Sequence, residues 1–437
     1  MATSWEISPD NLTYTFTLQT DIVFHDGTPL TAEDVVATWQ AGQDEDNVYA
    51  YLYEAASAVE AVDEYTVRIV TKEPDVLFLR DLHRWGIISA EQFAADGRDG
   101  LEEQPNGTGA FRFVEWQTDG RITLEANPTY WEPGLPHLAR LVFVPMPDGE
   151  ARAAAVQSGE VHIVPRLNAT QAQSLLGAPT VRVVRYPVDR VYYIAFNNLT
   201  TGVGLPTEDP LVRQAMNHAV NREAIVQRLF SGYARLSTGF VTPANLGFDE
   251  AVTPYTYDPD KARELLAEAG YPDGFAIGMA CPSGAYTNFE EVCKAVANDL
   301  AAVGITLEGE GLELIESSTF WELEADKALP PLFGDSWSDT SGEAIIRLKG
   351  ALMGDESTFA AWEDPQITAF LEAISGEFDQ EKRALLYREL SHYLFDNPPF
   401  IYLYEPNAFE AVNVAVQNYI PRAGEDYYLK TTFLAEE

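Results

Sequence analysis

Basic residues are scarce in this chain, and lysine is the scarcest of them. The 437 residues include 28 Lys and Arg, only 7 of them Lys, against 68 Asp and Glu, so the formal net charge is −40. Such a surface repels nucleic-acid phosphates and anionic lipid head groups, and we expect no nucleic-acid partner. Concentrated salt screens this repulsion, so the composition favours a salt-loving source. High-GC coding, which favours Arg over Lys, is the alternative for the low lysine content.

Cysteine and histidine are too few and too scattered for the common metal sites. Cys281 and Cys293 are the only cysteines, which excludes a zinc site and a disulfide framework. The simpler interpretation is two small buried apolar residues, and a single bridge is the alternative. The six His residues include no i,i+4 pair. We therefore expect no cofactor and no metal.

Long apolar runs are also missing. No segment is apolar enough to span a bilayer, and no basic-then-apolar signal peptide opens the chain. Hydrophobic residues nevertheless make up 46% and aromatic residues 12% of the chain. That material can fill the cores of two or three domains of about 100–150 residues each.

The periodic patterns predict an α/β protein with two lobes. Strand-rich sequence changes to helix-rich sequence near residue 191, and a buried strand at 398–405 leads back. Residues 31–39 predict a helix that Thr31 caps, with Asp34 three residues on. The main strands are expected at 12–24, 65–71, 121–125, 140–144, 180–187, 191–198, 275–280 and 305–309, and the main helices at 149–158, 210–220, 259–269, 289–303 and 379–395.

Catalytic motifs are absent, although paired acids keep one enzyme class open. The glycines of residues 106–109 lack a following Lys-Ser/Thr, so they indicate a turn rather than a phosphate loop. A carboxylate-dependent hydrolase using Glu290 and Glu291 is the enzyme alternative. Neighbouring residues on a helix point about 100° apart rather than converging on a substrate. Chance pairs are also expected among 68 acids.

Several segments resemble one known family in the same order along the chain. They include SWEISPDNLTYTFTLQTDIVFHDGTPLTAEDVV, GTGAFRFVEW, NPTYWEPGLPHLARLVF, AAVQSGEVHIV, YYIAFNN, DPLVRQAMNHAVNREAIV and YDPDKARELLAEAGYPDGF. Together they resemble the bacterial extracellular solute-binding proteins of family 5, which serve peptide/nickel-type ABC importers. The resemblance covers essentially all 437 residues.

The resemblance implies a two-lobed, hinge-closing fold of the periplasmic-binding-protein type (class II), with an extra small domain in the first lobe. Residues 1–190 and 406–437 would form the first lobe, with domains I and II. Residues 191–405 would form the second lobe, domain III. The implied protein is not an enzyme. It captures a peptide or similar small solute between its lobes, and its closed form is recognised by a permease.

The resemblance also implies partners and a place in the cell. The partners would be a peptide or other small solute and the permease subunits of an ABC importer. The protein would be a monomer outside the cytoplasm, in the periplasm or on the outer face of the membrane. It would associate with the membrane through the permease or a missing lipid anchor. A ligand sensor that reports to a receptor is the alternative that the sequence leaves open.

Two departures from the family pattern matter for the site. Family members carry a strand and a loop before the position of Trp5, so we expect a truncated reading frame or a variant without that strand. Peptide-binding members also hold the ligand ammonium with an Asp after a Trp. Here Trp337 matches that Trp, Asp339 follows one position too early, and Asp335 precedes it.

We expect Asp335, Trp337 and Asp339 to contact ligand from a small, flexible loop. The alternatives are a packing role for Trp337 and a solvated surface position for the two acids.

Overall fold

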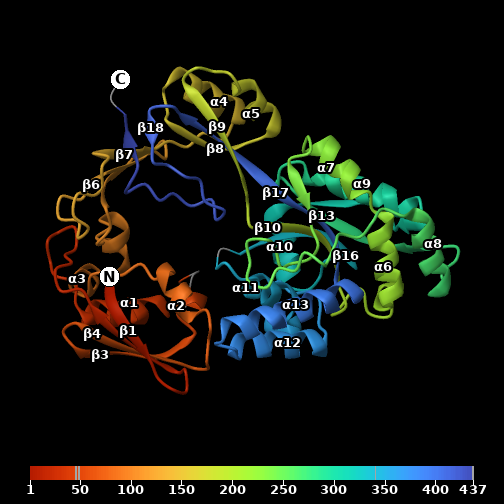
Figure 1. The fold of residues 1–437 in the computed structure, drawn as a ribbon, viewed down its shortest axis with the longest axis horizontal. Coiled ribbons are helices and arrows are strands. Elements are labelled where there is room, and N and C mark those ends of the chain that lie inside the picture. The colour runs from red at the N-terminus through yellow and green to blue at the C-terminus, as the bar shows by residue number, and fades with distance from the viewer. Residues whose placement is uncertain (45–46, 48–49, 340, 436–437) are drawn as a thin grey trace.

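A computed structural model describes residues 1–44, 47, 50–339 and 341–435. Thr340, part of the expected binding loop, and the last two residues of the predicted first lobe lie outside the described residues. Figure 1 shows two bodies, one built mainly from the N-terminal part of the chain and one from residues in the green-to-blue part of the colour range. The long strand β17 (Phe400–Asn413) runs from one body into the other.

The first body begins with an antiparallel sheet in the order β1-β2-β4-β3. Tyr14, Phe16 and Leu18 alternate along β2 and are buried, as their spacing predicts. The expected strand 12–24 ends early, at Leu18, and a separate turn follows in which the Phe24 N–H donates to the Thr28 carbonyl (2.8 Å). The strands are β1 (Ala2–Ile7), β2 (Thr13–Leu18), β3 (Ala56–Asp63) and β4 (Thr66–Thr71).

Short helices cover this sheet and extend from it. The cap at Thr31 is confirmed, since the Thr31 N–H donates to the Asp34 carboxylate (2.7 Å). Helix α2 lies on the side of the first body that faces the second (Figure 1). The helices are α1 (Ala32–Gly42), η1 (Ala50–Leu52), α2 (Phe78–Asp81), η2 (Leu82–Arg84) and α3 (Ala90–Glu103).

A second small sheet and a helical layer complete the first body. Strands β5, β6 and β7 form a three-stranded antiparallel sheet, while β8 and β9 pair with the second half of β17. Helices α4 and α5 pack on that half. The bounds are β5 (Phe111–Trp116), β6 (Ile122–Ala126), β7 (Arg140–Phe143), α4 (Gly149–Ser158), β8 (Ile163–Leu167), α5 (Ala169–Leu175) and β9 (Val181–Pro187).

The second body is a mixed sheet between helices, with strand order β11-β17-β10-β16-β13-β15. Every residue from Val191 to Phe196 is buried, as expected for a strand covered on both faces. The expected strand 275–280 splits into β12 and β13, and β12 pairs in parallel with β14.

The strands of this body, with the tail strands, are β10 (Arg190–Phe196), β11 (Ala234–Leu236), β12 (Phe275–Ile277), β13 (Met279–Ser283), β14 (Ile305–Leu307), β15 (Glu313–Glu316), β16 (Leu332–Ser338), β18 (Val416–Gln417) and β19 (Phe433–Leu434).

The helices of the second body begin where their caps predict. Asp209 accepts a hydrogen bond from Leu211 N–H (2.8 Å) before Pro210, and Asp258 accepts one from Lys261 N–H (2.9 Å). The helices are η3 (Pro206–Glu208), α6 (Pro210–Ala219), α7 (Arg222–Leu229), α8 (Pro259–Glu268), α9 (Phe289–Ala301), α10 (Ser317–Ala325), α11 (Ile345–Leu352), η4 (Gly354–Glu356), α12 (Pro365–Gly376) and α13 (Gln380–Asp396).

Two adjacent strands connect the bodies. The chain passes from β9 to β10 beside β17, and β17 pairs with both. Its first half pairs with β10 and β11 in the second body, and its second half pairs with β8 and β9 in the first. The two-lobed architecture is therefore present. The boundaries at 190/191 and 405/406 stay a prediction, and "first lobe" and "second lobe" are used for those ranges below.

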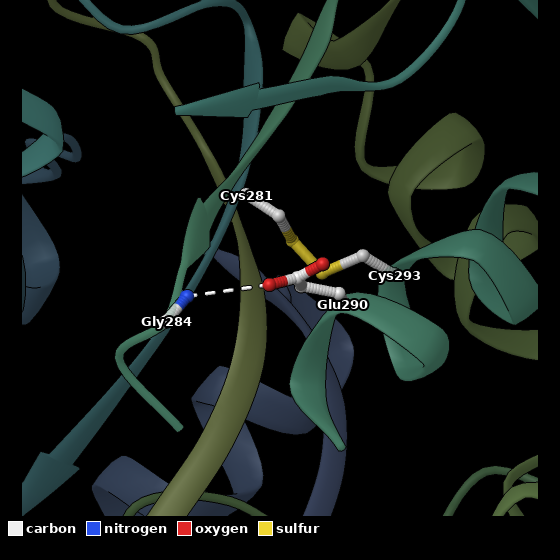
Figure 2. Close-up of a disulfide and its surroundings, with 4 residues drawn as sticks. All are labelled: Cys281, Gly284, Glu290 and Cys293. Atoms are coloured by element: carbon white, nitrogen blue, oxygen red, sulfur yellow. Dashed lines mark hydrogen bonds between the residues drawn. A yellow bond between two sulfur atoms is a disulfide. The ribbon is translucent and has the colours of Figure 1, made fainter. Parts of the chain in front are cut away.

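The interpretation of Cys281 and Cys293 as separate buried thiols is wrong. They form a disulfide that joins β13 to α9, with Cα atoms 6.6 Å apart (Figure 2). Beside it, Glu290 accepts a hydrogen bond from Gly284 N–H (3.2 Å). On the neighbouring strand, a Cβ added at Gly334 would lie 2.5 Å from the Cys281 sulfur. The disulfide therefore packs directly against the backbone of β16.

Candidate functional site

The expected site residues lie on and just after β16, in the middle of the second-lobe sheet. Arg190 pairs with Ser338 in the register of β10 and β16, and Tyr193 pairs with Asp335. Because side chains alternate along a strand, Asp335 and Trp337 share one face of the sheet. The prediction that residues 335–338 form a flexible loop is wrong, since they belong to β16. The first two residues of this strand, Leu332 and Phe333, are apolar and buried, and they anchor it in the core.

Asp335 is a buried carboxyl next to the hydroxyl of Tyr286. It is 5% exposed and accepts a hydrogen bond from the Tyr286 hydroxyl (2.8 Å). Burial raises the pKa of Asp335 above its usual range, and the Tyr286 hydrogen bond opposes that rise. The alternative of a solvated surface acid is therefore wrong for Asp335.

Glu324 on α10 is a second buried carboxyl beside Asp335. It is 4% exposed, and its Oε1 has no hydrogen-bond partner among the described residues. Burial, followed by the charge of Asp335, raises the pKa of Glu324 well above its usual range. Burial and their mutual repulsion therefore both oppose ionisation of the two carboxyls at the same time.

A positively charged side chain, Arg190, lies at the start of β10, and its charge acts to lower the pKa of Asp335. The Arg190 guanidinium donates to the Ser336 hydroxyl (2.8 Å) and lies 5.9 Å from the centre of the Tyr286 ring. No carboxylate among the described residues lies within 4.0 Å of it. Arg190 therefore offers charge and hydrogen-bond donors at the point where the chain enters the second lobe.

Trp337 packs against α11. A Cβ at Gly350 would meet the Trp337 ring at 2.5 Å, and the Phe359 ring centre lies 6.5 Å from that of Trp337. The indole Nε1 is buried without a hydrogen-bond partner among the described residues. Glycine at position 350 thus makes room for the indole, so at least part of Trp337 has a packing role.

Asp339 holds the turn between β16 and α11. Its Oδ1 accepts from the Ser341 N–H (2.9 Å) and hydroxyl (2.6 Å), and its Oδ2 accepts from the N–H groups of Ile346 (3.2 Å) and Arg347 (3.4 Å). These bonds use the acceptor positions that a carboxylate has. Burial raises the pKa of Asp339, and the Ser341 hydroxyl bond opposes it. Asp339 is 3% exposed, so it too is not a solvated surface acid.

Buried ion pairs fix the segment that follows Asp339. Arg347, fully buried, donates to Asp189 (2.6 Å) at the β9–β10 connection. Glu343, also fully buried, accepts two hydrogen bonds from Arg383 (2.9 and 2.8 Å). Such pairs are costly to break because one charge is left buried alone. The polar end of β16 is therefore held in one position.

Sequence reasoning placed Asp335, Trp337 and Asp339 on one segment, and the structure brings Asp335 and Trp337 to one face. It missed Arg190, Tyr286 and Glu324, which come from three other segments. The only sequence signal for Tyr286 is that it follows shortly after the end of a strand. No feature of the sequence around Glu324 marks it as a site residue. The described residues contain no group of three or more His, Cys, Asp or Glu side chains that could hold a metal ion.

The enzyme alternative gains no geometric support. Glu290 accepts a hydrogen bond from the Ser283 hydroxyl (3.0 Å), while Glu291 lies 3.7 Å from Lys294 on the helix surface. The two carboxylates serve separate contacts and do not converge on one point.

Comparison with known proteins identifies the family. Residues 1–346 match the family described as bacterial extracellular solute-binding proteins, family 5 Middle. The chain belongs to that family. This family 5 protein is 30% identical over 411 residues to the glutathione-binding protein GsiB of Salmonella paratyphi A, covering 92% of the chain and 79% of that protein. The GsiB of Pectobacterium atrosepticum is 31% identical over 413 residues, with the same coverage.

Solved structures agree with this assignment. HbpA2 from Haemophilus parasuis has a TM-score of 0.87 at 26% identity, covering 100% of this chain and 90% of that one. The periplasmic binding protein DppA from Helicobacter pylori, in complex with the peptide STSA, has the same fold, with a TM-score of 0.82 at 24% identity, covering 100% and 89%.

The predicted two-lobed fold and the role as a solute-binding component of an ABC importer are confirmed, and the family is one of binding proteins rather than enzymes. No helix among the described residues is long and apolar enough to cross a membrane.

Proposed function

We propose that this family 5 protein binds a peptide-sized solute between its first lobe (1–190 and 406–437) and its second lobe (191–405), and that the polar end of β16 recognises it. Glutathione and short peptides are the first ligands to test. The 30% identity to glutathione-binding relatives supports this choice, as does the shared fold with a protein bound to the peptide STSA.

The observation that carries the proposal is that the end of β16 presents Asp335 and Trp337 on one face and Ser336, bonded to Arg190, on the other, beside the point where β10 enters the second lobe. We assign the ligand ammonium to the carboxylates of Asp335 and Asp339, and a ligand carboxylate to Arg190. Asp339 contributes through its charge, because its oxygens already hold the turn before α11. Trp337 supplies an apolar wall. Lobe closure then removes water from these groups, which strengthens each charged contact.

Titration calorimetry on purified protein tests this assignment, after mass spectrometry of any co-purified solute. Charged hydrogen bonds contribute about 1.5–3 kcal/mol. Asp335→Asn and Asp339→Asn should therefore weaken binding of an ammonium-bearing ligand roughly ten- to hundredfold. Glu322→Gln, on the exposed face of α10, is the control. If both Asn variants bind like the parent, the assignment of these residues is wrong. If the parent binds no co-purified solute, glutathione or peptide, the ligand class is wrong.

We also propose that the protein works outside the cytoplasm as a monomer, in the periplasm or at the outer membrane face, and meets the membrane through permease subunits. The Cys281–Cys293 disulfide supports this compartment, because disulfides persist in oxidising surroundings. The charge of −40 supports a saline setting. Chromatography with light scattering in molar salt tests the monomer, and a mass twice that of one chain would refute it.

A further inference from the structure

The two lobes touch at a short segment around α2. Leu77, just before this helix, is 4% exposed, and it is the only buried member of the main hydrophobic cluster, within the described chain, that precedes residue 191. Every other buried member of that cluster belongs to the second lobe. Figure 1 shows α2 on the side of the first lobe nearest α11 and α12. The first lobe therefore reaches into the core of the second at this point.

Arg80 makes the polar contact across the same boundary. Its guanidinium donates to the carbonyl of Ser341 and lies 3.7 Å from Glu343 Oε1. Glu343 is fully buried and is held by Arg383 and by the Tyr387 hydroxyl (3.1 Å). The Arg80 side chain remains 42% exposed. It therefore sits at the rim of a fixed anionic group of the second lobe.

Asp81, the next residue, opposes contact between the lobes. Burial raises its pKa to about 6, and the charges of Asp75 in the first lobe and Asp339 in the second add to the rise. The Arg84 and His83 charges oppose it. When Asp81 is ionised, lobe contact sets it against Asp339. Neighbouring residues of one helical turn thus make an attractive pair, Arg80 with Glu343, and a repulsive pair, Asp81 with Asp339.

The charge of the whole lobes adds to this balance. The first lobe has 34 acidic residues against 15 Lys and Arg, and the second has 34 against 13. Closing therefore brings together two strongly negative bodies, which opposes closure at low ionic strength.

We propose that Leu77, Arg80 and Asp81 form a latch that sets how readily the lobes close without ligand, with Arg80 favouring and Asp81 opposing closure. This inference rests on the proposed hinge-closing function. Acidification from pH 7.5 to 5 neutralises Asp81 and shifts the equilibrium toward the closed form, and molar salt does the same by screening the lobes. A latch that raises the closed fraction raises ligand affinity without touching ligand.

Small-angle X-ray scattering of the ligand-free full chain tests the latch, because the radius of gyration falls as the lobes close. Arg80→Gln should enlarge the radius and Asp81→Asn should reduce it at pH 7.5, each through a roughly tenfold change in the closed-to-open ratio. Arg68→Gln is the matched control, since Arg68 pairs with Glu60 inside the first-lobe sheet (3.3 Å). The parent should compact on acidification and Asp81→Asn should not, which assigns the response to Asp81 rather than to His83.

Far-UV circular dichroism confirms that each variant is folded. The latch is refuted if folded Arg80→Gln and Asp81→Asn scatter like the parent, or if both move the radius in the same direction. Compaction of the parent by glutathione or a tripeptide, alongside unresponsive latch variants, rejects the latch and keeps the proposed function. Latch variants that shift the radius as predicted, in a parent that binds no tested solute, keep the latch and reject the proposed ligand class.

Discussion

Replacing Gly334 by alanine tests whether the disulfide truly packs on the strand that carries the site. Gly334 lies in β16, one residue before Asp335. An added Cβ would lie 2.5 Å from the Cys281 sulfur and 3.0 Å from both the Cys293 sulfur and a Phe289 ring carbon. Ordinary contacts between such atoms are roughly 3.5–4 Å. The strand and the disulfide must therefore move apart to admit one methyl group.

The net effect follows from two opposing terms. Overpacking a rigid core costs about 1–3 kcal/mol. Alanine also restricts the unfolded chain, which stabilises by about 0.4–1 kcal/mol wherever the native backbone suits it. Gly334 has no positive φ, so this gain applies. The expected result is a loss of roughly 0.5–2 kcal/mol in the free energy of unfolding.

Urea unfolding followed by tryptophan fluorescence in molar KCl measures this loss. Gly376→Ala is the control, because no atom lies within 4 Å of its added Cβ; it should be neutral or stabilising. The decisive comparison repeats Gly334→Ala in a chain with both cysteines changed to alanine, where the cost should shrink because the sulfurs are gone. An unchanged cost in that background, or a Gly334→Ala protein as stable as its parent, would refute the packing described above.

Three further outcomes are expected. Burial raises the pKa of Glu405 from 4.5 to about 7, against the pull of Arg235, so its contribution to stability is full below pH 4.5 and is lost as pH rises through 7. Thermal unfolding at pH values from 5 to 8 measures this effect: the parent should lose up to about 3 kcal/mol more stability over that range than Glu405→Gln does. Parallel stability profiles of the two proteins would contradict this. The melting temperature should rise between 0.01 M and 1 M KCl as the Debye length falls from about 30 to 3 Å; a flat or falling midpoint would be evidence against self-repulsion. Changing Cys281 and Cys293 together to alanine should cost about 2–4 kcal/mol in urea unfolding, and full parental stability would show that the bridge contributes nothing.

The sequence predicted those elements whose signals are local. Helix α4 has the expected bounds of 149–158, and the caps at Thr31, Asp209 and Asp258 form as predicted. Period-two burial was equally direct in β2. These features depend on residues within one turn or one strand. All the interacting groups therefore lie within a few positions of one another and can be recognised from a short stretch of sequence.

The site was predictable only in part, because its groups meet through the fold. Residues 335–338 are rich in small and polar residues, which favours a loop, but pairing with β10 makes them part of a strand whose first residues, Leu332 and Phe333, also pair with β13. The polar Asp335 tolerates that position because Tyr286 and Glu324 reach it from other segments. Likewise, two cysteines twelve residues apart are joined only because a strand and the following helix pack together. Residues that meet only through the fold have no fixed separation in the sequence, so no local pattern predicts their contact.

The pairing of β10 with β17 has a consequence for the gene as well as for the protein. Tyr192 and Tyr404 face each other in register, so the segment between them starts and finishes in neighbouring strands. Opposite residues of an antiparallel pair have Cα atoms about 4.5–5.5 Å apart. A block whose two ends meet can be excised or transplanted in one piece, with a few residues bridging the gap left behind. Recombination at these two codons would exchange the body built on residues 192–404 while leaving the rest of the molecule in place.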